Sequence, residues 1–365
     1  MSLKCGIVGL PNVGKSTLFN CLSNAKAQSA NFPFCTIEPN IGMITVPDDR
    51  LNQLAKLVKP ESVVPTNIEI VDIAGLVKGA SNGEGLGNKF LANIRETNAI
   101  IHVLRCFDDE NITHVEGSVN PIRDKEIIDL ELQLKDLETL EKLKSKNIRS
   151  AETGNKSSKI LISIIDRCIS YLEQGKSLRS FDFSNEDYLL ISNFNLLTIK
   201  PVLYLCNIDE QSINQTNKYV NEVKKIVNDE GAQILTIATS IESEIAELEN
   251  NDDRLMFLNE IGLSEPGVNN LITSTYQLLN LQTFFTAGKK EVRAWTIKKN
   301  SYAPQAAGVI HTDFEKGFIR AEVIAFDDFI SLGSELACKE AGKLSVEGKN
   351  YMVNDGDIMH FRFNV

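Results

Sequence analysis

The sequence predicts an α/β protein whose main part is a parallel sheet covered by helices on both faces, followed by a smaller α+β part. Three observations lead to this prediction. Short apolar runs alternate with helical patterns, an amphipathic stretch interrupts them between about residues 123 and 200, and β-like runs replace them after about residue 280. Such alternation is typical of parallel strands joined by crossover helices.

Five short apolar runs are the expected strands of the main sheet. Runs of four to six residues bounded by polar or turn-forming stretches are typical of buried strands. They span residues 5–8, 68–73, 100–104, 201–206 and 234–238.

The interruption predicts two amphipathic helices. Apolar residues recur three and four positions apart, which places them on one helical face. A polar, turn-forming stretch at residues 150–158 separates the two patterns, so we expect an antiparallel helical hairpin inserted into the main domain. The apolar positions are Ile127, Leu130, Leu134 and Leu137 in the first helix and Leu161, Ile165, Cys168 and Leu172 in the second.

The closing part of the chain has β-like runs at residues 291–297 and 319–324, with Gly and Asp turns between them. We therefore expect three domains. The nucleotide-binding domain spans residues 1–122 and 200–280, the inserted hairpin spans 123–199, and a small α+β domain spans 281–365.

Composition excludes several classes of protein. A hydrophobic content of 42% and a charged content of 24% are ordinary for a globular chain. The net charge of −11 argues against wrapping of nucleic acid, including DNA, although a local basic patch could still meet RNA phosphates. Seven cysteines without a C-x-x-C pair indicate neither a zinc site nor a disulfide framework. Without a membrane span or signal peptide, a cytoplasmic protein is expected.

The most informative motif lies between Gly9 and Ser16, which read Gly-Leu-Pro-Asn-Val-Gly-Lys-Ser. This is the P-loop pattern G-x-x-x-x-G-K-[ST], and it directly follows the first apolar run and precedes a helical pattern. Backbone N–H groups of such a turn point at phosphates, Lys15 reaches the β and γ oxygens as a catalytic residue, and Ser16 holds Mg²⁺. An ordinary glycine loop is the alternative. The expected nucleotide contacts are Asn12, Val13, Gly14, Lys15, Ser16 and Thr17.

A second motif, Asp72-Ile73-Ala74-Gly75, begins at the end of the second apolar run. Asp72 is the candidate carboxylate on the magnesium side, and Gly75 would sense the γ-phosphate. Thr36, in the stretch 31–36, is the candidate switch hydroxyl that closes on Mg²⁺. Taken alone, D-x-x-G is often only a turn. Leu76 stands where many regulatory GTPases carry a water-positioning Gln, so hydrolysis needs another residue or is slow.

The base-reading segment is Asn207-Ile208-Asp209-Glu210. A guanine-specific site carries Asn-Lys-x-Asp there. Ile208 replaces the Lys and Glu210 replaces the Asp, which compromises the guanine clamp and favours ATP over GTP. A simple strand-exit turn is the alternative. Ala238, Thr239 and Ser240 are expected to approach the base from the far side through their backbone.

Together these motifs resemble the YchF family of Obg-related, ribosome-associated ATPases, and the match runs essentially end to end. The resemblance implies a Ras-like domain, an inserted helical hairpin and a C-terminal TGS domain of ubiquitin-like β-grasp form. It also implies Mg²⁺ dependence, stimulation by K⁺, preference for ATP over GTP, and binding to the ribosome and its large subunit. The motifs span residues 9–16, 72–80, 207–210, 308–323 and 355–365.

The resemblance assigns roles to two further residues. Asn12 occupies the position that helps hold K⁺ in potassium-dependent relatives, and His114 replaces the missing Gln as the residue that orients or deprotonates the attacking water. Without the resemblance, a loop histidine such as His114 is more often simply solvated. Our hypothesis is that His114 moves into the site only in an activating complex.

A basic cluster within residues 142–159 is expected to touch ribosomal RNA phosphates, and a solvated charged face is the alternative. Three functions stay open: an ATP-hydrolysing regulator of translation or stress response, a GTPase switch, and a ribosome-binding module whose nucleotide site is mainly conformational. A small-molecule kinase is less compatible with the motifs. The cluster comprises Lys142, Lys144, Lys146, Arg149, Lys156 and Lys159.

Overall fold

The computed structural model describes residues 3–27, 41–73, 86–248 and 250–364. The chain divides into two compact units. Met1–Met43 with Glu69–Leu271 form the first unit, and Ile44–Ile68 with Ile272–Val365 form the second. Among the described residues, no helix is long and apolar enough to cross a membrane.

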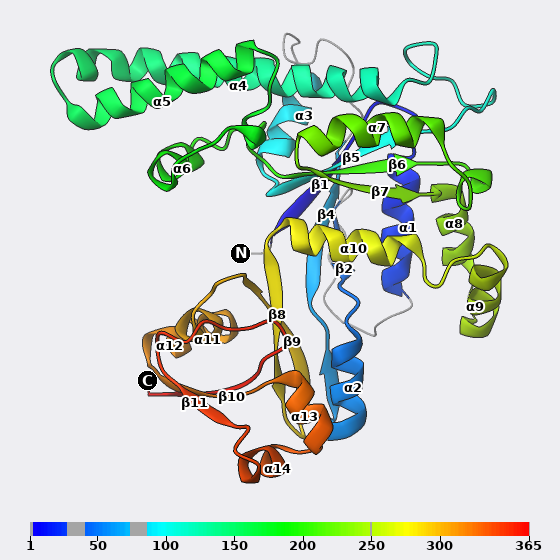
Figure 1. Ribbon diagram of the computed structural model, residues 1–365, viewed down its shortest axis with the longest axis vertical. Helices are drawn as coiled ribbons and strands as arrows, with labels where there is room; N and C mark the ends of the chain where they lie inside the picture. The colour runs from blue at the N-terminus through cyan, green and yellow to red at the C-terminus, as the bar shows by residue number, and fades with distance from the viewer. Residues whose placement is uncertain (1–2, 28–40, 74–85, 249, 365) are drawn as a thin grey trace. The chain divides into compact units, whose positions relative to one another are not determined.

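A six-stranded sheet forms the centre of the first unit, in the order β2-β4-β1-β5-β6-β7 (Figure 1). β1 pairs in parallel with β4 and β5, β5 with β6, and β6 with β7. Every residue of β5 and β6 is buried, as expected for central strands covered on both faces. Each of the five predicted strands is present. The strands are β1 (Lys4–Val8), β2 (Ile41–Thr45), β4 (Asn67–Asp72), β5 (Ala99–Arg105), β6 (Val202–Asn207) and β7 (Gln233–Ile237).

Helices pack against this sheet and against one another. α1 contacts β1 and α8, and α7 contacts β7. The α/β P-loop fold predicted from the sequence is therefore present. Its helices are α1 (Lys15–Ala27), α3 (Leu86–Arg95), α7 (Lys218–Asp229), α8 (Thr239–Glu247), α9 (Asn251–Glu260) and α10 (Gly267–Leu278), the last of which crosses into the second unit.

Two long helices, α4 (Pro121–Glu152) and α5 (Lys156–Glu173), occupy the predicted interruption. α4 begins with Pro121 after the N-cap Asn120, and α5 begins after Asn155, whose side chain accepts a hydrogen bond from the Ser158 amide. α5 lies along the outer part of α4 (Figure 1). Leu140 of α4 packs in one hydrophobic cluster with Ile165 and Cys168 of α5. A short 3₁₀ turn (Leu178–Ser180) and α6 (Asn185–Ser192) follow α5.

The buried face of α4 differs from the predicted one. Leu130 and Leu134, which we expected to pack, are exposed, whereas Ile128 and Leu132 are buried. The inner, N-terminal half of α4 packs against the sheet rather than against α5. This half buries charged residues as well as apolar ones. The pattern of α5 is confirmed at Ile165, Cys168 and Leu172.

A charged network fixes the inner half of α4. Lys125 pairs with Asp129 at 2.8 Å and also with Glu230. Arg179 reaches Asp129 at 3.3 Å and the Tyr204 hydroxyl at 3.4 Å. Buried charges are tolerated where they pair in this way. The start of α4 is thereby held on the strand β6 and on the residue that ends α7.

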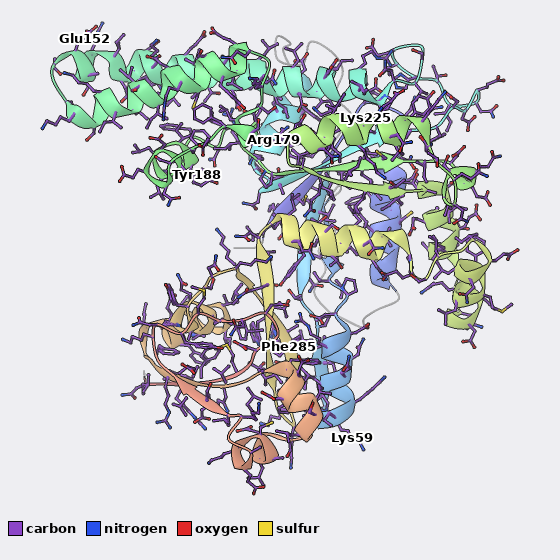
Figure 2. The ribbon with its side chains drawn as sticks, viewed as in Figure 1. Lys59, Glu152, Arg179, Tyr188, Lys225 and Phe285 are labelled. Atoms are coloured by element: carbon purple, nitrogen blue, oxygen red, sulfur yellow. The ribbon has the colours of Figure 1, made fainter. Side chains whose placement is uncertain are left out.

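The second unit contains its own six-stranded sheet, in the order β11-β10-β12-β8-β9-β3. Two consecutive residues of β8 belong to different hydrophobic clusters, Phe284 to one and Phe285, which Figure 2 labels, to the other. The strands are β3 (Ser62–Val64), β8 (Leu281–Ala287), β9 (Glu291–Lys298), β10 (Phe318–Ile324), β11 (Ser345–Glu347) and β12 (Ile358–Phe363). The helices are α2 (Asp49–Val58), α11 (Ala303–Ile310), α12 (Thr312–Lys316), α13 (Phe326–Leu332) and α14 (Glu335–Glu340).

Residues 44–68 group with this second unit and not with the nucleotide domain, to which the predicted boundary of 1–122 assigned them. β3 pairs in parallel with β9, Ser62 opposite Glu291. Leu51 and Leu54 of α2 are buried in the same cluster as Phe285. Residues 44–68 thus add an edge strand and a covering helix to the second unit. The later boundary between the units lies at about residue 271, whereas the predicted one is at residue 280.

Candidate functional site

The turn between β1 and α1 has the backbone of a phosphate-binding loop. Asn12 and Gly14 have φ values of 62° and 102°, in the left-handed region. A Cβ on Gly14 would lie 2.4 Å from Asn207 Nδ2, so only glycine fits there. The turn ends at the N-terminus of α1, where free N–H groups and the helix dipole favour anions.

Lys15, the first residue of α1, is 7% exposed. Its Nζ donates a hydrogen bond to the Leu10 carbonyl oxygen at 2.7 Å. Burial lowers the pKa of Lys15 to about 8, and the negative charge of Asp72 partly opposes this shift. The ammonium group therefore lies inside the loop, beside the Asp72 carboxylate.

Ser16 and Asp72 meet across the ends of α1 and β4. The Ser16 hydroxyl donates to Asp72 Oδ2 at 3.3 Å. Asp72 Oδ1 is buried and has no hydrogen-bond partner among the residues that the structure describes. Burial raises the pKa of this carboxyl group, while Lys15 and Ser16 lower it. An orphaned carboxylate oxygen beside a hydroxyl fits a hard divalent cation such as Mg²⁺.

The remaining predicted phosphate-side residues are placed unevenly. Val13 is buried and Thr17 is half-buried in the first turn of α1. Asn12 is exposed, and its Nδ2 donates to the Thr113 carbonyl oxygen at 3.1 Å. Thr36 and Gly75, with Leu76, lie outside the described residues.

Asn207, the last residue of β6, joins the two sides of the site. Its Nδ2 donates to the Val13 carbonyl oxygen at 2.9 Å, and its Oδ1 accepts from the Thr239 amide at 3.1 Å. The side chain is 2% exposed. One buried amide thus holds the phosphate loop against the start of α8.

The predicted base side of the site borders a cavity with both apolar and polar lining residues. Ile208 and Ala238 are each 5% exposed and line a cavity of about 180 Å³. The Ile208 amide donates to the Ile237 carbonyl oxygen at 3.0 Å. Glu210, in the short 3₁₀ helix Glu210–Ser212, and Ser240, in the first turn of α8, are exposed.

Glu242, which the sequence analysis missed, also lines this cavity. It is 3% exposed and accepts hydrogen bonds from the amides of Gly267 at 2.7 Å and Val268 at 3.3 Å, where α10 begins. Burial raises the pKa of its carboxyl group. Only the tertiary contact between α8 and α10 identifies it, because a glutamate within a polar helix is unremarkable in sequence.

His114 is buried, at 8% exposure, so the expectation of a solvated loop histidine is wrong. Its Nε2 lies 2.9 Å from Asp124 Oδ2. The Glu116 amide donates to its Nδ1 at 3.1 Å. Both ring nitrogens are therefore engaged, and the preceding residue, Thr113, is bonded to Asn12 of the phosphate loop.

Arg105, at the end of β5, shapes the loop before His114 and was also missed. It is 1% exposed and donates to the carbonyl oxygens of Phe107, Asp109 and Ile112 at 3.1, 3.1 and 2.9 Å. A buried arginine that satisfies three carbonyl groups replaces regular secondary structure here. No sequence pattern distinguishes it from a surface arginine.

The predicted basic cluster lies around the turn between α4 and α5, next to Glu152 in Figure 2. Lys142 pairs with Glu138, and Lys144 pairs with Asp166 at 2.7 Å. The other four cations are exposed, and none of them forms an ion pair within the described ranges: Lys146, Arg149, Lys156 and Lys159.

Two family models match the chain. The one described as "50S ribosome-binding GTPase" matches residues 4–138, and YchF-GTPase_C, described as a protein of unknown function (DUF933), matches residues 281–364. The chain is 54% identical over 365 residues to "Ribosome-binding ATPase YchF" of Pasteurella multocida, and 51% identical over 367 residues to the protein of that name in Bacillus subtilis. Both alignments cover 100% of each chain.

A solved structure is also similar. "Structure of the Schizosaccharomyces pombe YchF GTPase" shares 40% sequence identity with this chain, and the match covers 99% of this chain and 98% of that one. The TM-score is 0.90. The similarity thus extends over both units and is not confined to the P-loop.

Proposed function

Because the chain belongs to the YchF family of P-loop nucleoside triphosphatases, we propose that it binds the ribosome and hydrolyses ATP in preference to GTP with Mg²⁺. The observation that carries the proposal is the meeting of Lys15, Ser16 and Asp72 at the start of α1. The cytoplasm is the expected location.

The phosphate side supplies the electrostatics of hydrolysis. Backbone N–H groups around Gly14 bind the phosphate oxygens, and Lys15 exchanges the Leu10 carbonyl for the β and γ oxygens. Ser16 and Asp72 would hold Mg²⁺, which would supply positive charge for the phosphate oxygens. Thr36 is the proposed third ligand and Gly75 the proposed sensor of the γ-phosphate.

The base side supplies the choice of nucleotide. Ile208 and Ala238 offer apolar surface to a base, and the buried Asn207 amide bonds to the Val13 carbonyl and the Thr239 amide. Guanine would bury its N1–H and 2-amino group there without the short carboxylate that normally accepts them. Adenine lacks the 2-amino group, so the apolar wall costs it less.

His114 takes the place of the absent glutamine. The water oxygen bonds to the γ-phosphorus, the bond to the bridging oxygen breaks, and the imidazole accepts the water proton. Asn12 is the candidate K⁺ ligand, because its exposed side chain lies in the loop between Gly9 and Gly14. The two ring contacts of His114 support slow turnover until the loop is rearranged.

The ribosome contact is proposed for the basic cluster, with the large subunit and its RNA phosphates as the partner. Four exposed cations without ion pairs at the α4–α5 turn favour a polyanion over a solvated face. Residues 123–199 are proposed as the inserted hairpin domain and the C-terminal unit as a TGS domain.

Turnover of ATP measured with and without ribosomes tests this function. We expect ribosomes to stimulate hydrolysis. We expect His114→Ala to lower the ribosome-stimulated rate at least about tenfold. The control is His311→Ala, an exposed histidine of the second unit. Ribosome binding without any change in turnover would instead favour the second candidate, a binding module whose nucleotide site is conformational.

A further inference from the structure

We propose that Asp124 is the positioning residue of His114: it fixes the imidazole in the tautomer whose Nδ1 accepts the water proton, and the Glu116 amide covers that atom until the loop opens. This inference rests on the proposed role of His114 in hydrolysis. It adds the identity of the reacting nitrogen, the residue that selects it, and the contact that must be released.

The two ring contacts agree on a single tautomer. The Glu116 amide can only donate, so Nδ1 must present a lone pair to it. In a neutral imidazole the proton then sits on Nε2, from which it is donated to Asp124 Oδ2 at 2.9 Å. The hydrogen-bond network thus assigns the proton without reference to any ligand.

Asp124 is held in place by burial and by its contacts in the first turn of α4. It is 1% exposed and lies in the first turn of α4, which Asn120 caps. Its other oxygen, Oδ1, accepts from Arg123 Nε at 3.2 Å and from Arg123 Nη2 at 3.0 Å. The inner half of α4 is anchored in turn by the network around Asp129. The carboxylate therefore stays in place when the loop moves.

The two contacts differ in what their release costs. Breaking the Nε2 contact would leave a buried carboxylate oxygen without its partner, whereas breaking the Nδ1 contact exposes one backbone amide to water. Glu116 and Gly117 are exposed, and Gly117 has a φ of 75° with nothing within 4 Å of its Cβ position. Nδ1 is therefore the nitrogen that opening of the turn uncovers.

The turn also has a defined position relative to the phosphate loop. Arg105 holds the carbonyl groups of Phe107, Asp109 and Ile112, so the loop is fixed as far as Ile112. Thr113 accepts a hydrogen bond from Asn12 of the phosphate loop. The segment that can rearrange thus follows His114, whose ring stays bonded to Asp124.

The proton transfer balances without any proton passing to Asp124. The water oxygen bonds to the γ-phosphorus as the bond to the bridging oxygen breaks, and the water proton moves to Nδ1. In the resulting imidazolium the proton on Nε2 stays hydrogen-bonded to Asp124, and this contact stabilises the positive charge of the ring. Transfer of the Nδ1 proton to solvent returns the ring to its starting tautomer.

Asp124→Asn tests the tautomer directly. The amide has one acceptor oxygen, and the two donors of Arg123 compete for it with His114. If that oxygen faces Arg123, the Asn amide nitrogen faces Nε2, which must then accept. The proton moves to Nδ1, and the hydrogen bond from the Glu116 amide is lost. The base is lost although the ring stays in place.

The experiment combines spectroscopy with kinetics on the full chain. Two-bond ¹H–¹⁵N correlation spectra of ¹⁵N-histidine-labelled protein, assigned with His114→Ala among the four histidines, identify the tautomer. We expect the Nε2–H form in the wild type and the Nδ1–H form in Asp124→Asn. Ribosome-stimulated kcat should fall at least about tenfold with KM for ATP nearly unchanged.

Asp108→Asn is the matched control, because Asp108 is an exposed carboxylate of the same loop that contacts the Tyr219 hydroxyl. Asp124→Glu, which keeps the charge, should recover part of the rate. An unchanged tautomer in Asp124→Asn, or a changed tautomer with wild-type kcat, would overturn the inference. Loss of rate in His114→Ala alongside such a result would leave the proposed function standing, and an unaffected His114→Ala would overturn both.

Discussion

The phosphate end and the base end of the site are built from opposite kinds of groups. At the phosphate end a buried ammonium, a hydroxyl and a carboxylate converge, and one carboxylate oxygen lacks a partner within the described chain. At the base end Ile208 and Ala238 give a small cavity an apolar wall, and Glu210 lies outside it in solvent. The two ends therefore do different work.

The difference teaches where selection takes place. The phosphate end offers charge and N–H groups to any nucleoside triphosphate, so it binds and polarises without choosing. The base end discriminates between adenine and guanine because it leaves the N1–H and 2-amino group of guanine without hydrogen-bond acceptors. Asn207 joins the two ends, and its side-chain amide forms hydrogen bonds with the protein backbone on both sides.

The largest effect is expected from the phosphate end. Asp72→Asn removes the charge that binds the divalent cation. It should lower turnover about 100-fold or more with ATP and with GTP. Turnover across a Mg²⁺ titration is the measurement. The control is Glu69→Gln, on the same strand, whose carboxylate pairs with Lys4 at 3.4 Å.

The same variant separates chemistry from folding. Because burial raises the pKa of Asp72 in the folded chain, its ionised form opposes folding at neutral pH, and the folded state gains stability as the group is protonated. Asp72→Asn should therefore melt at the wild-type temperature or above it. A lowered melting temperature together with unchanged turnover would reverse our description of this end of the site.

A smaller effect is expected from the base end, and it should appear as a ratio. Ile208→Lys combined with Glu210→Asp restores the groups that line a guanine base. It should move the ratio of ATP to GTP affinity about 10- to 100-fold toward GTP. Calorimetry with non-hydrolysable analogues measures it, with Ile208→Leu as the conservative control. Equal loss of both affinities would mean that this segment does not read the base.

The smallest effect is a pH dependence that belongs to the phosphate end alone. Lys15 has a pKa of about 8, and phosphates favour its protonated form. Nucleotide binding should thus take up a proton above pH 8, with affinity falling up to about tenfold per pH unit there and staying flat below. Calorimetry in buffers of different ionisation enthalpy measures the uptake. Lys15→Arg should abolish it, and a persisting dependence would exclude Lys15 as the source.

The contrast also explains how much the sequence could predict. The P-loop, Asp72 and Asn207 follow strands whose apolar runs mark them, so contiguous motifs at strand ends were sufficient to place them. The parallel sheet follows from the same runs. Thr36 and Gly75 belong to this group of predictions, but they lie outside the described residues.

What the sequence could not predict depends on contacts between distant segments. The burial of His114 needs Asp124 from the next helix, and Glu242 becomes part of the base side only through the start of α10. Leu130 and Leu134 fit a helical period but face solvent, because α4 buries Lys125 and Asp129 in a charged network instead. Residues 44–68 carry no signal of membership in the second unit, since an edge strand and a covering helix suit either sheet.

The most direct test of the account is a comparison of ATP and GTP on the unaltered chain. Calorimetric titration with non-hydrolysable analogues of each, at the same Mg²⁺ concentration, isolates the base end, because the phosphate end is common to both ligands. The account predicts that the ATP analogue binds at least about tenfold more tightly. Equal affinities, or tighter binding of the GTP analogue, would contradict it.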